Sequence, residues 1–268
     1  MITSGEIQKI AKGEIPDKTV EKDYILAWVL IGMSNIGLGK KLIFKGGTAL
    51  RKFYYKDYRY SEDLDFTLYR ENQKDKILDD IKPIVPALKE LANISIELNP
   101  ESQKFKNTIT FYIQYAGPLG GMISKNNIKV DITVKELVIY PVNPVKLLPL
   151  YSDQPRNITF PVYSLEEIMI EKICSILDPA RHEPRDVYDI WHLLEYGGVE
   201  LHTLRDDFFK KCKFKQLEKD YLKIQVDKKD PVYQKLWEVR LGNQMTGLPP
   251  FDNVYRAIKR HLRKAQLI

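Results

Sequence analysis

The chain has 268 residues, of which 44% are hydrophobic and 29% charged, so it has ample material for a packed core and is not expected to be disordered. An excess of 42 Lys and Arg over 36 Asp and Glu gives a formal charge of +6, which permits a nucleic-acid partner without demanding one. The two cysteines, Cys174 and Cys212, exclude a disulfide framework and a paired-cysteine zinc site, and the lack of a signal-peptide pattern or a bilayer-length apolar run predicts a cytoplasmic protein without a membrane partner.

The first half of the chain alternates helical and strand patterns. Apolar residues at helical spacing predict a helix over residues 19–36, and "KKLIFKGG" then predicts a short buried strand that ends in two glycines. "TALRKFYYK" predicts a helix, "DLDFTLY" a strand, and "QKDKILDDIKPIVPALKEL" a helix that is interrupted by prolines. "ISIEL", "NTITFYIQYAG" and "NIKVDITVKE" alternate apolar and polar residues, which predicts three half-buried strands.

The second half has a different character. Residues 143–161 are rich in proline and predict a loop, and nearly everything beyond them has the period of helices. "FDNVYRAIKRHLRKAQ" predicts a basic amphipathic C-terminal helix with Asp252 as its N-cap. The patterns therefore predict an α+β protein, with strands and helices in residues 1–160 and a helical domain in residues 161–268.

Gly46 and Gly47 lie between a predicted strand and a predicted helix. Backbone N–H groups at such a turn can bind an anion, and glycine lets a phosphate approach the main chain. Thr48 could cap the helix and donate its hydroxyl to the same phosphate. A plain turn is the alternative interpretation, because short glycine motifs often match by chance.

Asp63 and Asp65 carry the stronger signal. Residues two apart on a strand point to the same face, about 7 Å apart, so these two carboxylates would repel each other unless cations bind between them. Mg²⁺ prefers such oxygen ligands and often bridges a carboxylate to substrate phosphates. Asp131, in "IKVDITV", could join them from a neighbouring strand. The alternative for all three is a solvated strand face.

Lys172 lies in the middle of an apolar helical stripe. Ser164 and Glu167 have the spacing of a capping box at the start of this helix. A lysine on a core-facing stripe either extends to an edge or meets a buried anion. Asp186 and Asp189 flank the apolar face of the next predicted helix and need a partner, for which Lys172, Arg185 or a metal could serve. For Asp186 the alternative is an interaction with the helix dipole.

Two groups of cations remain. By default they are solvated surfaces, and they are also plausible contacts for a phosphate backbone. They are Lys210, Lys211, Lys213 and Lys215, and near the C-terminus Lys259, Arg260, Arg263 and Lys264.

Four segments in order resemble a known family. "VEKDYILAWVL", "FKGGTALRK", "RYSEDLDF" and "RDVYDI" are similar to the AbiEii/AbiGii toxins within the DNA-polymerase-β-like nucleotidyltransferase superfamily, over residues 20 to about 195. The resemblance implies a nucleotidyltransferase-type mixed β-sheet with flanking helices, followed by a helical bundle that completes the active site.

The resemblance also implies roles for particular residues. We expect Gly46, Gly47 and Thr48 to hold the triphosphate of an NTP, with Lys45 and Ser61 as further nucleotide-binding residues. We expect Asp63 and Asp65 to be catalytic and to bind Mg²⁺ or Mn²⁺ with Asp131, and Lys172 and Asp186 to complete the catalytic set.

In the family, this chemistry can add nucleotides to the 3′ end of tRNA and so stop translation. The resemblance therefore implies a phage-defence toxin whose partners are an NTP, an RNA acceptor and an antitoxin encoded nearby. Two alternatives stay open: nucleotidyl transfer to a small molecule, and a non-catalytic nucleotide-binding interaction module.

Overall fold

The computed structural model describes residues 1–99, 103–104 and 107–268. Within these residues the chain forms two compact units. The first contains Met1–Glu136 and Val142–Val162, and the second contains Leu137–Pro141 and Tyr163–Ile268. The sequence predicts a single boundary after residue 160, whereas in the structure the short segment Leu137–Pro141 also belongs with the helices.

The first unit is built on a mixed sheet. Its strands lie in the order β3-β5-β6-β2-β1-β8-β7, with β4 beside β5. The described strands are β1 (Leu42–Lys45), β2 (Leu64–Leu68), β3 (Ser95–Leu98), β4 (Gln103–Lys104), β5 (Thr108–Ala116), β6 (Asn127–Thr133), β7 (Asn143–Lys146) and β8 (Thr159–Val162). The strand β2 lies at the centre, antiparallel to β1 and parallel to β6. The predicted α+β class and mixed sheet are confirmed.

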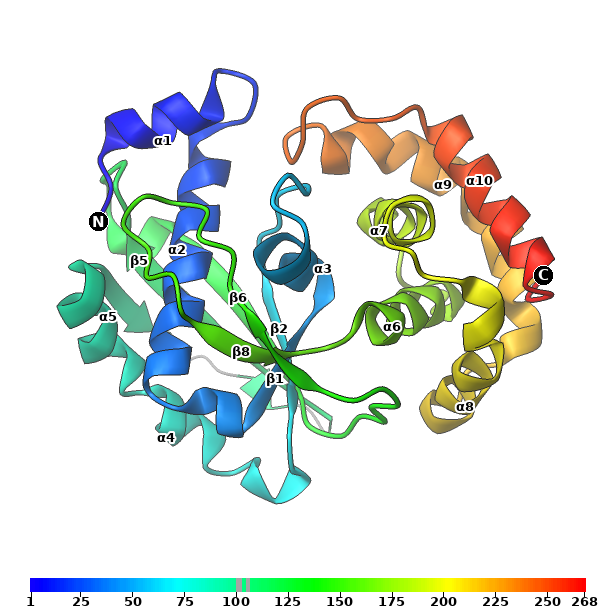
Figure 1. Cartoon of the computed structure of the whole chain (residues 1–268), viewed down its shortest axis with the longest axis horizontal. Helices are drawn as coiled ribbons and strands as arrows, with labels where there is room; N and C mark the ends of the chain where they lie inside the picture. Colours follow the sequence, from blue (N-terminus) through cyan, green and yellow to red (C-terminus); the bar gives the residue numbers. More distant parts are fainter. Residues whose placement is uncertain (100–102, 105–106) are drawn as a thin grey trace. The chain divides into compact units, whose positions relative to one another are not determined.

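Helices surround this sheet. The α-helices of the first unit are α1 (Ser4–Ala11), α2 (Asp17–Asn35), α3 (Gly46–Ala49), α4 (Ile77–Ile81) and α5 (Ile84–Ala92). Helix α3 continues into a π-helical turn, η2 (Leu50–Tyr54). Helices α2 and α5 lie on the same side of the sheet and pack so closely that a Cβ at Gly32 would lie 3.0 Å from Leu88 (Figure 1).

The predicted loop at residues 143–161 is wrong at both of its ends. Strands β7 and β8 form there and pair with each other, and Pro144 lies opposite Pro161. Proline cannot donate a backbone hydrogen bond, which favours a loop, but Pro144 lies on the edge strand β7, where proline is tolerated.

The described part of the second unit is helical. Its α-helices are α6 (Leu165–Leu177), α7 (Pro184–Glu195), α8 (Arg205–Lys215), α9 (Leu222–Leu241) and α10 (Phe251–Lys264). The expected cap of α10 is wrong, because the N-cap residue is Pro250 and Asp252 lies inside the first turn, where a negative charge favours the helix dipole. None of the helices in the described chain is long and apolar enough to cross a membrane.

Candidate active site

The glycine turn lies against one of the predicted metal-binding carboxylates. Strand β1 pairs with β2 so that Lys45 lies opposite Asp65, and helix α3 begins at the next residue, Gly46. Gly46 has a φ of 81°, and a Cβ built on it would lie 2.6 Å from Asp65 Oδ2. The backbone of the turn therefore lies close to this carboxylate, and only glycine combines the left-handed conformation with so close an approach.

Thr48 makes a side-chain hydrogen bond within the chain. Its buried hydroxyl donates a hydrogen bond to the backbone oxygen of Asp63, at 2.6 Å. The N-cap residue of α3 is Lys45, which makes no side-chain capping bond, so the expected Thr48 cap is wrong. Thr48 instead ties the start of the helix to the residue that precedes β2. The first N–H groups of a helix have no partner one turn earlier in the helix. Because the Thr48 hydroxyl already donates to Asp63, these backbone N–H groups are the candidate donors to an anion at this turn.

Asp63 and Asp65 have the predicted alternation. Both are half-buried, whereas the intervening Leu64 and the following Phe66 are completely buried. Asp63 lies one residue before β2 rather than on it. Ser61 is buried in the segment that leads to this strand.

Asp131 lies beside Asp65. The parallel pairing of β2 with β6 places the two residues directly opposite each other. The Asp131 carboxylate accepts a hydrogen bond from Thr110 Oγ1 at 2.6 Å and forms an ion pair with Lys129 Nζ at 2.7 Å. Partial burial opposes the effect, but the hydrogen bond to Asp131 and the charges of Asp131 and Asp63 raise the pKa of Lys129. Sequence reasoning missed Thr110, because only strand register brings it to this face.

The donor set suits a hard cation. Carboxylate oxygens are the ligands Mg²⁺ prefers, and one or two of them plus substrate phosphates commonly suffice. The missing Cβ of Gly46 also leaves space beside Asp65 Oδ2 that any other residue would fill. Among the residues that the structure describes, no three acidic, histidine or cysteine side chains form a metal cluster by themselves. The pair Asp63 and Asp65 therefore fits Mg²⁺ in combination with a substrate, whereas Asp131 is engaged by Lys129 and Thr110.

A buried ionic network supports the helix that follows the glycine turn. The carboxylate of Asp23, on α2, contacts Arg51 Nε at 2.8 Å and Lys52 Nζ at 2.7 Å, and it accepts a hydrogen bond from the Tyr151 hydroxyl at 2.6 Å. Burial alone would raise the pKa of Asp23, but the charges of Arg51 and Lys52 hold it below its ordinary value. Burial lowers the pKa of Lys52 to about 8. Asp23 lies within a segment that carries the family resemblance, yet its burial left no signal in the sequence.

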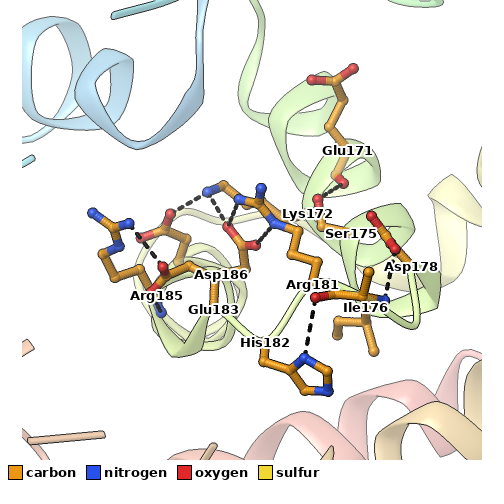
Figure 2. Close-up of polar contacts among 12 residues, drawn as sticks. Glu171, Lys172, Ser175, Ile176, Asp178, Arg181, His182, Glu183, Arg185 and Asp186 are labelled. Atoms are coloured by element: carbon orange, nitrogen blue, oxygen red, sulfur yellow. Dashed lines mark hydrogen bonds and ion pairs between the residues drawn. The ribbon is translucent and has the colours of Figure 1, made fainter. Parts of the chain in front are cut away.

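The second unit holds a separate charged cluster. Lys172, on α6, contacts Asp186 at 2.6 Å and Asp189 at 2.7 Å, and both aspartates come from α7. Arg181, in the turn between the two helices, contacts the other oxygen of Asp186 at 2.6 Å (Figure 2). Burial opposes the effect, but Lys172 and Arg181 hold the pKa of Asp186 below its ordinary value.

The buried anions beside Lys172 and the capping bond of Ser164 agree with the sequence prediction. Lys172 is 9% exposed and meets buried anions, and Ser164 accepts the capping bond from the backbone N–H of Glu167. Arg185, an alternative partner, contacts Glu183 at 2.9 Å. Sequence reasoning missed Arg181, which lies in a turn without periodic pattern.

A buried lysine of α9 holds this turn in place. Lys229 Nζ donates to the backbone oxygens of Ile176, Asp178 and Arg181, at 2.7, 2.5 and 2.9 Å. Its ammonium thereby satisfies carbonyls at the C-terminal end of α6, which otherwise have no partner in the helix. Lys229 is 1% exposed, and burial lowers its pKa.

Solved structures share this fold. JHP933 from Helicobacter pylori matches with a TM-score of 0.57 and 18% identity, over 94% of this chain and 93% of that chain. A second solved structure from H. pylori, provisionally described as that of a nucleotidyltransferase, matches with a TM-score of 0.56 and 19% identity, over 90% of this chain and 96% of that chain. No curated protein matches this chain in sequence.

Family membership rests on a sequence match that covers most of the chain. Residues 28–257 match the family described as nucleotidyl transferase AbiEii toxin, type IV toxin–antitoxin system. The matched range contains the glycine turn, Asp63, Asp65, Lys172 and Asp186. The chain therefore belongs to the AbiEii family of nucleotidyltransferase toxins of type IV toxin–antitoxin systems.

Proposed function

We propose that this nucleotidyltransferase is Mg²⁺-dependent and moves NMP from an NTP onto an RNA acceptor, for which the 3′ end of tRNA is our candidate. Its other partner would be an antitoxin encoded nearby. The observation that supports the proposal is the close approach of the glycine turn to Asp65, because a backbone that could bind phosphate then lies beside a carboxylate that could bind a cation.

In this proposal the chain's own residues position the NTP. The N–H groups of Gly46, Gly47 and Thr48 bind its phosphates, and Lys45 and Ser61 flank the nucleotide. Asp63 and Asp65 would hold Mg²⁺ or Mn²⁺, which when bound neutralises charge on the triphosphate. The acceptor ribose oxygen forms a bond to the α-phosphorus, the bond to pyrophosphate breaks, and the hydroxyl proton is released.

The Lys172 cluster would serve the same reaction. Two carboxylates neutralise Lys172, whereas the side chain of Arg181 is 47% exposed. Arg181 is thus the cation of the cluster that can best reach a substrate phosphate, and its guanidinium suits phosphate oxygens. Lys172 fixes Asp186, which in turn holds Arg181.

Labelled NTPs test the proposal directly. The full-length protein is incubated with each of the four α-³²P NTPs, total tRNA and Mg²⁺ or Mn²⁺, and we expect label to enter RNA. Asp63→Ala and Asp65→Ala should each reduce transfer on the order of 100-fold or more, because each removes charge stabilisation at the reacting phosphates. Asp57→Ala is the matched control, because Asp57 is exposed six residues before Asp63.

Two outcomes would contradict the proposal. No transfer to RNA with any NTP under either cation would remove the RNA acceptor, and transfer to an added aminoglycoside instead would favour the small-molecule alternative. Full activity of Asp63→Ala would remove the metal-binding role. Thermal unfolding of each variant separates lost activity from lost fold.

A further inference from the structure

Helix α10 concentrates the positive charge of the second unit. It carries five Lys and Arg residues against one Asp, whereas the rest of this unit has 14 Lys and Arg against 16 Asp and Glu. Without α10 the unit would therefore be slightly acidic, so its cationic character comes from one helix.

The charge lies on one side of that helix. Val254, Tyr255, Ile258 and Leu262 are buried along its apolar side. A basic stripe, defined as Arg256, Arg260, Arg263 and Lys264, is exposed. At 100° per residue these four positions fall within an arc of about 100° and extend over roughly 12 Å of the helix.

Acidic neighbours neutralise the stripe only partly. Arg260 lies 3.5 Å from Glu195, and Arg263 lowers the pKa of Asp227 after larger effects from Lys223 and Lys259. In the part of the chain that the structure describes, Arg256 and Lys264 form no ion pair. The helix dipole accounts for cations in the last turn, such as Arg263 and Lys264, but not for Arg256 in the first half of the helix.

We propose that the basic stripe of α10 binds the phosphate backbone of the RNA acceptor. This inference rests on the proposed function and adds to it a surface for the acceptor. Charge complementarity carries it, because exposed guanidinium groups along a rigid helix pair with phosphate oxygens and position a nucleic acid without reading its bases.

The salt dependence of RNA binding tests this surface. Fluorescence anisotropy measures binding of a labelled hairpin RNA with a single-stranded 3′ end to the full-length protein at several salt concentrations. The stripe variant carries Arg256→Gln, Arg260→Gln and Arg263→Gln. The control carries Lys12→Gln, Lys40→Gln and Lys89→Gln, three exposed lysines of the first unit.

We expect the stripe variant to bind RNA at least tenfold more weakly. The slope of log K against log salt should become less steep by about 2, because each lost phosphate contact removes about 0.7 on single strands. The control should retain the wild-type slope, and NTP binding should be unchanged in both variants.

The outcomes separate this inference from the proposed function. If the wild type labels RNA but the stripe variant keeps wild-type affinity and slope, the surface is wrong and the function stands. If the wild type neither binds nor labels RNA, both fall. Tighter binding to a DNA hairpin of the same sequence overturns the assignment to RNA.

Discussion

At the scale of single residues, Gly46 links two halves of the proposed chemistry. Its left-handed backbone turns β1 into α3, and its missing side chain lets the turn approach Asp65. The two requirements are independent, because the first concerns φ and the second concerns space. They can be separated by substitution.

Gly46→Ala should abolish NMP transfer while leaving most of the protein folded. The left-handed conformation costs alanine roughly 1–2 kcal/mol, and the new Cβ would in addition displace the Asp65 carboxylate that lies 2.6 Å from it. Transfer of α-³²P label and thermal unfolding measure the two effects.

Gly120→Ala is the control for conformation alone. Gly120 also has a positive φ, of 76°, but a Cβ there meets no atom within 4 Å. It should lose similar stability and keep its activity. Equal activity loss in both variants, or full activity of Gly46→Ala, would show that the contact with Asp65 does not matter.

The sequence predicts some residues of this site better than others. Alternation identified Asp63 and Asp65, because their neighbours Leu64 and Phe66 had to face the core. The Thr48 hydroxyl, a predicted phosphate ligand, donates a hydrogen bond to the backbone oxygen of Asp63 in this structure, and no local pattern could predict that bond because it depends on how helix and strand meet in space. Asp131 was a candidate from its own strand, and only the register of β6 against β2 shows that it lies beside Asp65.

At the scale of elements, the turn between α6 and α7 depends on a third helix. Lys229 of α9 binds three carbonyls at the end of α6 and in the turn, including that of Arg181. The stripe pattern of α6 predicted a buried partner for Lys172. Lys229 lies on a comparable stripe of α9, between Val226 and Tyr233, but its partners are backbone oxygens 48 to 53 residues away, which a stripe does not identify.

Lys229→Met should loosen this turn. The buried carbonyl of Ile176 and the part-buried carbonyls of Asp178 and Arg181 lose their donor. A buried unsatisfied group costs about 1–3 kcal/mol, so the variant should be destabilised by at least about that amount. Amide hydrogen exchange should rise at residues 178–183, and NMP transfer should fall because Arg181 is no longer held.

Lys228→Met provides the comparison. Lys228 is the neighbouring residue and is exposed, so its loss should change stability by no more than about 0.5 kcal/mol. If Lys229→Met keeps wild-type exchange at the turn, Lys229 does not position Arg181. Recovery of exchange protection in Lys229→Arg would indicate that the donated hydrogen bonds, rather than packing, hold the turn.

At the scale of the whole molecule, the chain passes between the two units three times. It leaves the first unit after Glu136, returns at Val142 and leaves again after Val162. The segment between these crossings, Leu137–Pro141, is held within the second unit by Glu167, which accepts hydrogen bonds from the N–H groups of Ile139 and Tyr140. Neither unit is therefore a continuous stretch of sequence.

Lys211 completes this attachment. Its buried ammonium contacts Glu167 at 2.7 Å and donates to the backbone oxygen of Leu137. The expectation that Lys211 is solvated is wrong, because Lys211 and Glu167 are both 0% exposed. A run of lysines is typical of a solvated surface. The partners of Lys211 lie 44 and 74 residues away in the sequence, so no local pattern could predict them.

Glu167→Gln should therefore release the segment Leu137–Pro141. The substitution keeps the shape and removes the charge, which leaves the Lys211 ammonium buried without its main counterion, at a cost on the order of 3 kcal/mol. Urea unfolding should show this loss, and amide exchange should rise at Ile139 and Tyr140, because a neutral amide is a weaker acceptor than a carboxylate.

Glu166→Gln is the control, because Glu166 is a half-buried neighbour of Glu167. Its unfolding free energy and its amide exchange at Ile139 and Tyr140 should stay near wild type. Unchanged exchange at Ile139 and Tyr140 in Glu167→Gln would mean that packing alone holds the segment Leu137–Pro141 in the second unit. The buried ion pair between Lys211 and Glu167 would then have no part in holding it.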